Sequence, residues 1–150
     1  MKYFRLVAGA LLALFMTFMG SQKFGESNPV FSYIAAQSGI ELFEPLVRMV
    51  TGVAELAAAV LILLGLFLGI ARGLGALLSL AVIGGAILFH LSPWLGINAP
   101  VAFAENGGYV FSPMLFIMAV VFFALSAGLT YADRDALLPS KADDAADANG

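Results

Sequence analysis

Long runs of apolar residues separated by short polar segments dominate the pattern along this chain. Four runs, at about 4–20, 46–70, 74–91 and 114–131, are continuous rather than alternating. A helix needs about 20 mostly apolar residues to cross a bilayer, with a range near 17–25. Only helices and closed barrels satisfy their backbone groups in lipid, and a continuous run favours the helix. The pattern therefore predicts an all-α integral membrane protein, with a four-helix transmembrane bundle in residues 1–131.

The first apolar run also has features of a cleaved signal peptide, since Lys2 and Arg5 precede it. However, the segment Met19-Gly20-Ser21 is a poor match to an A-x-A-like cleavage site, and three further apolar runs follow. We therefore expect the first run to remain in the protein as a transmembrane helix.

The distribution of lysine and arginine predicts the orientation of the helices. One side of the membrane would carry Lys2, Arg5, Arg72, Arg134 and Lys141. The other side would carry only Lys23 and Arg48. Because cytoplasmic loops are enriched in these residues, both termini are predicted to be cytoplasmic.

Two segments outside the apolar runs have patterns of their own. Residues 101–111, in the second outer loop, alternate on both sides of Asn106-Gly107-Gly108, which indicates a small β-hairpin. Residues 132–150 end in a small, polar and acidic stretch, which predicts a disordered cytoplasmic tail.

Ionisable residues gather toward the outer ends of the predicted helices. Lys23 follows the first helix, Arg48 lies in the first turn of the second, and His90 ends the third. Glu55 lies seven residues beyond Arg48, or about 10 Å deeper at 1.5 Å per residue. A carboxylate at depth costs about 2.5–3.5 kcal/mol on insertion scales, so we expect Glu55 to face the protein interior.

Further polar residues support this predicted site. Arg48, Thr51 and Glu55 recur at spacings of three and four, which places them on one helix face. Glu44 and Arg48 have the i, i+4 spacing of an ion pair. The alternative is that Glu44 caps the helix, since proline fits best in the first helical turn. Gln22 lies beside Lys23, and glycines on both sides permit close approach of another backbone.

Each of these residues has a functional and a structural interpretation. Glu55 would be a proton-relay or ligand-anchoring carboxylate, or one half of a buried ion pair with Lys23 or Arg48 that fixes the first two helices together. Lys23 alone is also typical of a lysine that extends to the lipid headgroups. His90 alone is also typical of a hydrogen-bonded residue at a helix end. The sequence leaves these alternatives open.

Composition limits the chemistry of the chain. Hydrophobic residues make up 61% of it and charged residues only 11%, against about 25% charged in soluble domains. The chain has no cysteine, which excludes thiol–disulfide chemistry and cysteine-ligated clusters. Its single histidine excludes a haem held by two histidines of this chain. With a net charge of −3 and no basic tract, no nucleic-acid partner is expected, and no residue spacing indicates a metal site.

Three stretches in order resemble the DoxX and DoxX-like membrane proteins. They are Gly20-x-x-Lys23-Phe24, "GVAELAAAVLILLGL" at 52–66 and "AILFHL" at 86–91. The resemblance implies a four-helix, multi-pass protein of the bacterial inner membrane. It also implies an association with quinone-linked or other redox complexes, and it places Lys23, Glu55 and His90 on recurrent polar positions of the family. Arg48 is added to this set because of its position on the helix face and not because of the resemblance.

The function expected from these observations is that of a non-catalytic membrane subunit or accessory protein. It would contact the lipid bilayer and other membrane subunits or a second copy of itself. It would hold no cofactor within the chain, although a quinone or another lipophile is a candidate ligand of the polar site. The alternative is a small proton-coupled transporter or channel that uses Glu55. No nucleophile–base pair or nucleotide motif indicates an enzyme on its own.

Overall fold

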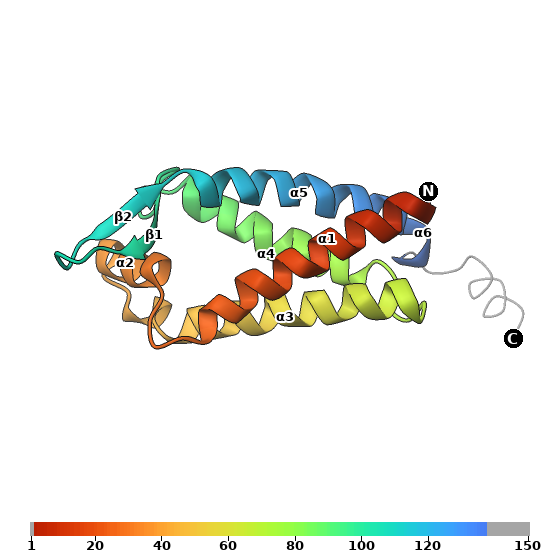
Figure 1. Ribbon diagram of the computed structural model, residues 1–150, viewed down its shortest axis with the longest axis horizontal. Coiled ribbons are helices and arrows are strands. Elements are labelled where there is room, and N and C mark those ends of the chain that lie inside the picture. The colour runs from red at the N-terminus through yellow and green to blue at the C-terminus, as the bar shows by residue number, and fades with distance from the viewer. Residues whose placement is uncertain (1, 138–150) are drawn as a thin grey trace, which may run out of the picture.

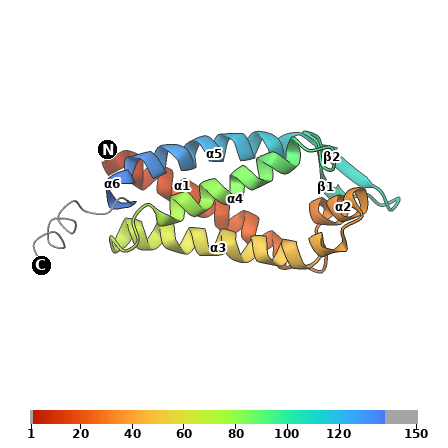
Figure 2. The same ribbon diagram turned by 180° about the vertical axis from the view of Figure 1, so that it is seen from behind.

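Four longer helices lie alongside one another in the computed structural model, which describes residues 2–137. They are α1 (Lys2–Ser21), α3 (Leu46–Phe67), α4 (Leu74–His90) and α5 (Met114–Ala132). Helices α3 and α5 lie at opposite edges, α1 crosses one side of this pair, and α4 crosses the other side (Figures 1 and 2). The four apolar runs of the sequence thus correspond to the four longer helices of a mostly helical fold.

Three of these helices, α1, α3 and α5, are long and apolar enough to cross a membrane. Helix α4 is equally apolar but shorter, with 17 residues. Large apolar side chains cover the outward faces, as at Leu14 and Leu88, which are 69% and 70% exposed. Such a surface is suited to lipid rather than water. The prediction of a membrane protein is confirmed to this extent, whereas the fourth crossing and the cytoplasmic termini remain predictions.

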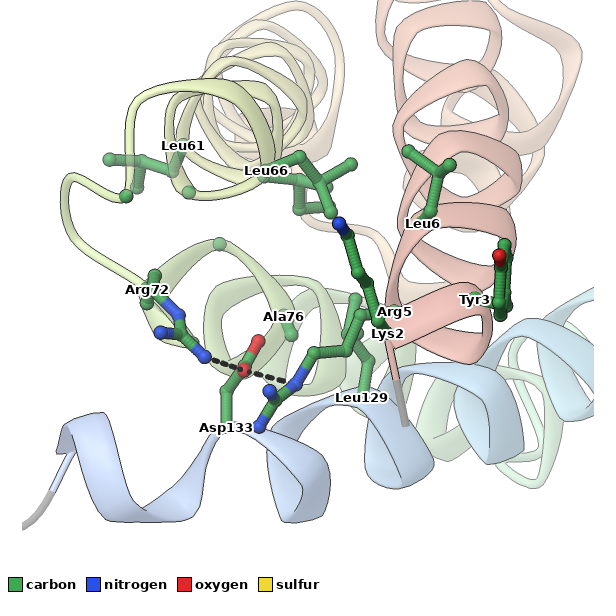
Figure 3. A pocket seen from close by; sticks show the side chains of 15 residues that line it. Lys2, Tyr3, Arg5, Leu6, Leu61, Leu66, Arg72, Ala76, Leu129 and Asp133 are labelled. Carbon is green, nitrogen blue, oxygen red and sulfur yellow. Dashed lines mark hydrogen bonds and ion pairs between the residues drawn. The ribbon is translucent and has the colours of Figure 1, made fainter.

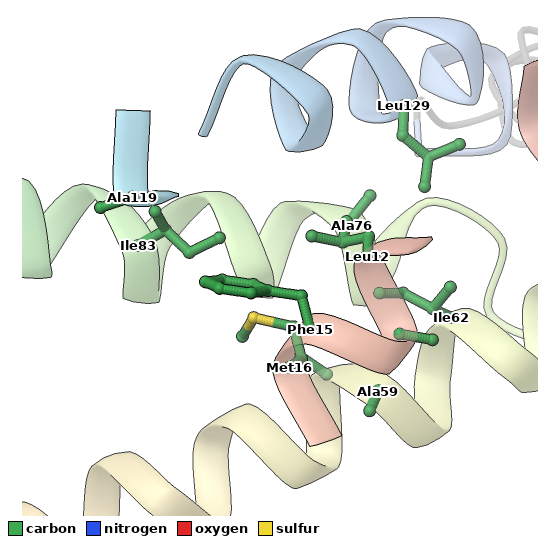
Figure 4. Close-up of a cluster of buried hydrophobic side chains, with 11 residues drawn as sticks. Leu12, Phe15, Met16, Ala59, Ile62, Ala76, Ile83, Ala119 and Leu129 are labelled. Carbon is green, nitrogen blue, oxygen red and sulfur yellow. The ribbon is translucent and has the colours of Figure 1, made fainter. Parts of the chain in front are cut away.

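The core lies where α1 crosses the other helices (Figure 4). Leu12 and Met16 of α1 are fully buried. Phe15 of α1 stacks on Phe122 of α5, with ring centroids 3.8 Å apart. Helices α3 and α4 approach closely at Gly75, where an added Cβ would lie 2.5 Å from the backbone nitrogen of Ile62. Small residues at such crossings let apolar helices approach closely. Van der Waals contacts can then hold the helices together in lipid, where the hydrophobic effect does not act between them.

The first loop contains a helix that the sequence analysis did not predict, α2 (Pro29–Ser38). The side chain of Asn28 accepts hydrogen bonds from the backbone nitrogens of Val30 and Phe31, and proline occupies the first helical position. Gly39 ends the helix in a left-handed conformation, with φ of 70°. These signals were present in the sequence, but the segment lacks a long apolar run.

The second long loop forms the predicted hairpin, with β1 (Ala99–Phe103) antiparallel to β2 (Tyr109–Ser112). Tyr33 of α2 packs edge-on against the rings of Tyr109 and Phe111, each at 5.4 Å between centroids. Aromatic contact between α2 and the hairpin supports a two-stranded sheet that would be marginal in isolation. We call α2 and this hairpin the cap, and the helix ends beneath it the cap end.

The opposite end, which we call the terminal end, contains the start of α1, the α3–α4 turn and a short helix α6 (Arg134–Leu137). The turn uses residues with positive φ at Gly69, Ala71 and Gly73. The predicted tail was to begin at residue 132, but the chain remains helical to Leu137 apart from a turn at Asp133. The rest of the predicted tail, residues 138–150, lies outside the described residues.

Candidate functional site

A buried ion pair joins the end of α1 to α3 at the cap end. A short 3-10 helix, η1 (Gln22–Phe24), continues α1 and turns Lys23 toward α3. Lys23 Nζ donates to Glu55 Oε2 at 2.7 Å, and the two side chains are 7% and 9% exposed. The same Nζ also donates to the carbonyl of Met19 at 3.2 Å. The structure thus brings together two residues that the sequence placed on separate helices.

Two glycines allow α1 and α3 to approach closely enough for this pair. A Cβ added at Gly52 of α3 would lie 2.9 Å from Cβ of Lys23. A Cβ added at Gly20 of α1 would lie 3.0 Å from Leu56 Cδ2 and 3.1 Å from Glu55 Cβ. The distances at Gly20 are tighter than most real Cβ contacts, and at Gly52 some part of the structure would have to move. The glycines are therefore part of the geometry that positions the ion pair.

Arg48 holds the chain segment that leaves α1. Its guanidinium, in a side chain that is only 3% exposed, donates to the carbonyls of Lys23 and Gly25, the latter at 2.7 Å, with a longer contact of 3.5 Å to Glu26. Nε of Arg48 lies 2.6 Å from Glu44 Oε1, so the predicted i, i+4 contact is present. This contact is an ion pair without the alignment of a hydrogen bond. Arg48 therefore fixes the backbone next to Lys23.

His90 belongs to a separate environment. It is buried at the end of α4, where its Nδ1 lies 2.9 Å from the carbonyl of Gly96 and its ring meets Phe116 edge-on at 5.5 Å. Within residues 2–137, no hydrogen bond or ion pair joins His90 to Lys23, Arg48 or Glu55. The predicted four-residue cluster therefore contains three connected residues and one that stands apart.

Within residues 2–137, neither of the two remaining supporting residues forms a hydrogen bond or ion pair with Lys23 or Glu55. Gln22 is exposed. Thr51 donates from Oγ1 to the carbonyl of Val47, at 2.7 Å within its own helix. The sequence correctly placed Thr51 on the face of Arg48, but its hydroxyl serves the helix backbone.

The charges of the connected cluster balance. Lys23 faces Glu55, and Arg48 faces Glu44, so each carboxylate has one cation. A buried pair is stable only when geometry and additional hydrogen bonds offset the cost of removing charges from water. The pair of Lys23 and Glu55 is hydrogen-bonded, and Lys23 makes one further hydrogen bond, whereas Glu44 Oε2 has no hydrogen-bond partner in the described part of the chain. Among residues 2–137, no group of three or more histidine or carboxylate residues could hold a metal ion. The arrangement is suited to joining two helices and holding carbonyl groups.

Aromatic residues from separate segments gather at the cap end. Phe43 and Phe89 meet edge-on at 5.4 Å, and Trp94 lies 6.4 Å from each of them. On the hairpin, Phe103 and Phe111 remain 49% and 48% exposed. No local pattern in the sequence indicated that these loops would meet.

Comparisons of the chain with protein-family models, with curated proteins and with solved structures find no match. The resemblance to the DoxX-like proteins thus rests only on three short stretches of sequence, in or next to α1, α3 and α4, and on their order along the chain.

Proposed function

We propose that this protein is a non-catalytic integral membrane subunit or accessory protein that crosses the membrane with four helices. The observation that carries the proposal is the buried 2.7 Å contact between Lys23 and Glu55, which joins α1 to α3. A lysine and a carboxylate that neutralise each other are poor acid–base catalysts, but they hold two helices in a single arrangement. The cluster would thereby position the cap for contact with another membrane component.

Exposed apolar side chains on the two strands of the hairpin support a partner at the cap. Val110, Phe111 and Phe103 are each close to half exposed, although they are large and apolar. Several large exposed apolar groups on one small element favour a contact with protein or membrane. The partner would be another membrane subunit or a second copy of this chain.

The resemblance to DoxX-like proteins of the bacterial inner membrane suggests a quinone-linked or other redox-associated complex. A quinone presents carbonyl oxygens, and Arg48 already binds backbone carbonyls at Lys23 and Gly25. A quinone or another carbonyl-bearing lipophile would be held by the same donors if it displaced one of these groups. No cofactor of the chain's own is required for this role.

The alternative, a proton-coupled transporter that uses Glu55, makes a different demand on the carboxylate. A coupling carboxylate must exchange protons with water, whereas Glu55 is buried against Lys23. The ion pair therefore favours the subunit over the transporter.

Native mass spectrometry of the protein, extracted with its surrounding lipid in nanodiscs, tests the proposal. We expect a second protein chain or a bound lipophile in the wild type. Its occupancy should fall in the apolar double variant Lys23→Met/Glu55→Leu, which removes both charges together. Arg134→Gln, an exposed charge at the terminal end, is the matched control and should leave occupancy unchanged.

Two results would contradict the proposal. One is a double variant that retains every bound component, since the cluster would then serve folding alone. The other is proton-coupled flux in liposomes that disappears in Glu55→Gln, which would favour the transporter.

A further inference from the structure

A second feature lies at the terminal end, far along the helices from the ion pair. A cavity of about 350 Å³ opens between the start of α1, the end of α3, the start of α4 and the end of α5 (Figure 3). A hollow next to it shares Arg5, Arg72 and Asp133 with the cavity. None of the residues considered for the cap-end site lines either space.

The charges around the cavity do not balance. Its lining contains three cations, Lys2, Arg5 and Arg72, and a single carboxylate, Asp133. Asp135 borders only the neighbouring hollow, is 87% exposed, and lies 3.7 Å from Arg134. The lining thus has a surplus of positive charge, in contrast to the balanced cluster at the cap end.

Asp133 holds two of the cations without using all of their donors. Its Oδ1 lies 2.9 Å from Arg5 Nε and 3.3 Å from Arg72 Nη2, and Figure 3 shows the two arginines reaching it from different sides. Arg5 also donates to the carbonyl of Ala132. Within residues 2–137, no ion pair engages Lys2. Because each guanidinium carries five N–H donors, several remain for an anion with more than one oxygen.

The walls beneath the charges are apolar. Leu61 and Leu66 of α3, Leu6 of α1 and Leu129 of α5 line the cavity. Gly65 leaves room on the same face, since a Cβ added there would meet nothing closer than 3.4 Å. The cavity therefore has a cationic rim and an apolar interior.

We propose that this cavity binds an anionic phospholipid, with the phosphate held by Lys2, Arg5 and Arg72 and the upper acyl chain against Leu61 and Leu66. The helices that line it are suited to lipid contact, and helix ends with surplus cations lie where headgroups are found. The lysine and arginine distribution predicts this end to be cytoplasmic, the side on which anionic lipids attract basic groups. A free phosphate would match the rim but would leave the apolar walls without a partner.

The test is native mass spectrometry of the full chain in nanodiscs that contain equal amounts of phosphatidylglycerol and phosphatidylcholine. We expect retained phosphatidylglycerol on the wild type. Lys2→Gln and Arg72→Gln should each lower its occupancy about fivefold, and together about 25-fold. Arg134→Gln removes one cation from the same end without touching the cavity lining, and it should change occupancy less than twofold.

Folding of the variants is checked separately from lipid binding. Lys2 is exposed, and Arg5 still pairs with Asp133 when Arg72 is replaced. The melting temperature of both variants in phosphatidylcholine alone should therefore equal that of the wild type. A loss of lipid with an unchanged melting temperature supports binding at the cavity.

Three outcomes would overturn the proposal. The first is equal retention of the two lipids, and the second is an equal loss in Arg134→Gln. The third is displacement of the lipid by millimolar inorganic phosphate, which would make the site a receptor for the free anion. The proposal is independent of the function proposed for the cap end, since none of its variants alters Lys23, Arg48 or Glu55.

Discussion

At the scale of single residues, the position of Glu55 depends on one partner and two glycines. Its carboxylate would be costly in the apolar part of a helix without a cation, and Lys23 supplies that cation from a segment 32 positions earlier. Gly20 and Gly52 let the helices approach, and Arg48 fixes the backbone of Lys23. The ion pair with Lys23, the close approach at the glycines and the hydrogen bonds of Arg48 therefore all contribute to the position of Glu55.

Removal of one member of the ion pair should be far more harmful than removal of both. We expect Glu55→Ala to lower the free energy of unfolding by about 3–5 kcal/mol, because Lys23 would remain buried without its partner. Lys23→Met/Glu55→Leu should stay within about 1 kcal/mol of the wild type. Reversible unfolding in mixed micelles measures both, with Glu105→Ala on the exposed hairpin loop as control. Equal losses in the single and double variants would contradict this account.

A second comparison of stability uses two glycines within helices, Gly52 in a close contact and Gly85 in open space. Gly52→Ala should lower the free energy of unfolding by about 1–3 kcal/mol, because its Cβ would lie 2.9 Å from that of Lys23. Gly85 meets nothing within 4 Å, so Gly85→Ala should be neutral or stabilising by up to about 1 kcal/mol. The same unfolding assay applies. A neutral Gly52→Ala would show that the interface between α1 and α3 has room to adjust.

At the scale of elements, the cap depends on contacts between two loops that neither loop could form alone. Helix α2 has its own capping residues, but it has only ten residues and would be marginal as an isolated helix. The hairpin has two strands and would also be marginal. Tyr33 joins them through its contacts with Tyr109 and Phe111, so the two elements should be stable only together.

Replacement of Tyr33 should therefore loosen both parts of the cap. We expect Tyr33→Ala to increase amide hydrogen exchange in α2 and also in β1 and β2, because two aromatic contacts worth about 0.5–1.5 kcal/mol each are lost. Exchange in α3 and α5 should not change. Gln37→Ala, at an exposed position of the same helix, is the control. Faster exchange in α2 alone would show that the hairpin does not depend on it.

At the scale of the whole molecule, the two ends differ in electrostatic character. The cap end has balanced buried charges under an aromatic surface, and the terminal end has surplus cations around a cavity. The predicted orientation of the helices rests on these same cations, among them Lys2, Arg5 and Arg72. It would place the cap outside the cytoplasm and the cationic cavity at the cytoplasmic leaflet.

The absence of cysteine from the sequence makes this orientation straightforward to test. Glu105→Cys lies on the exposed hairpin loop of the cap, and Arg134→Cys lies at the exposed terminal end. In intact cells, a membrane-impermeant thiol reagent should label only Glu105→Cys, and Arg134→Cys should react only after permeabilisation. The reverse pattern would place the cationic cavity outside, and labelling of both in intact cells would rule out opposite sides.

Features that depend on residues close together in the chain follow from local sequence patterns. Continuous apolar runs dictate helices that begin and end within three residues of the predicted positions, and the alternation around Asn106 dictates the hairpin. The spacing of Glu44 and Arg48 predicted their contact, although Glu44 lies in extended backbone just before α3 and not on the face of that helix. Helix α2 had local signals too, but a short helix has too little periodicity to be found from its apolar pattern.

The packing of the helices, in contrast, selects which distant residues meet. It paired Glu55 with Lys23, placed Arg48 on backbone carbonyls, and left His90 with Gly96, although the sequence had placed all four near one end of the helices. It also created the cavity around Arg5 and Arg72, from four segments far apart in the chain. The rotation and crossing of helices depend on close packing at positions such as Gly52 and Gly75, where a single methyl group would move a neighbour. Such contacts join residues of separate helices, so no local pattern encodes them.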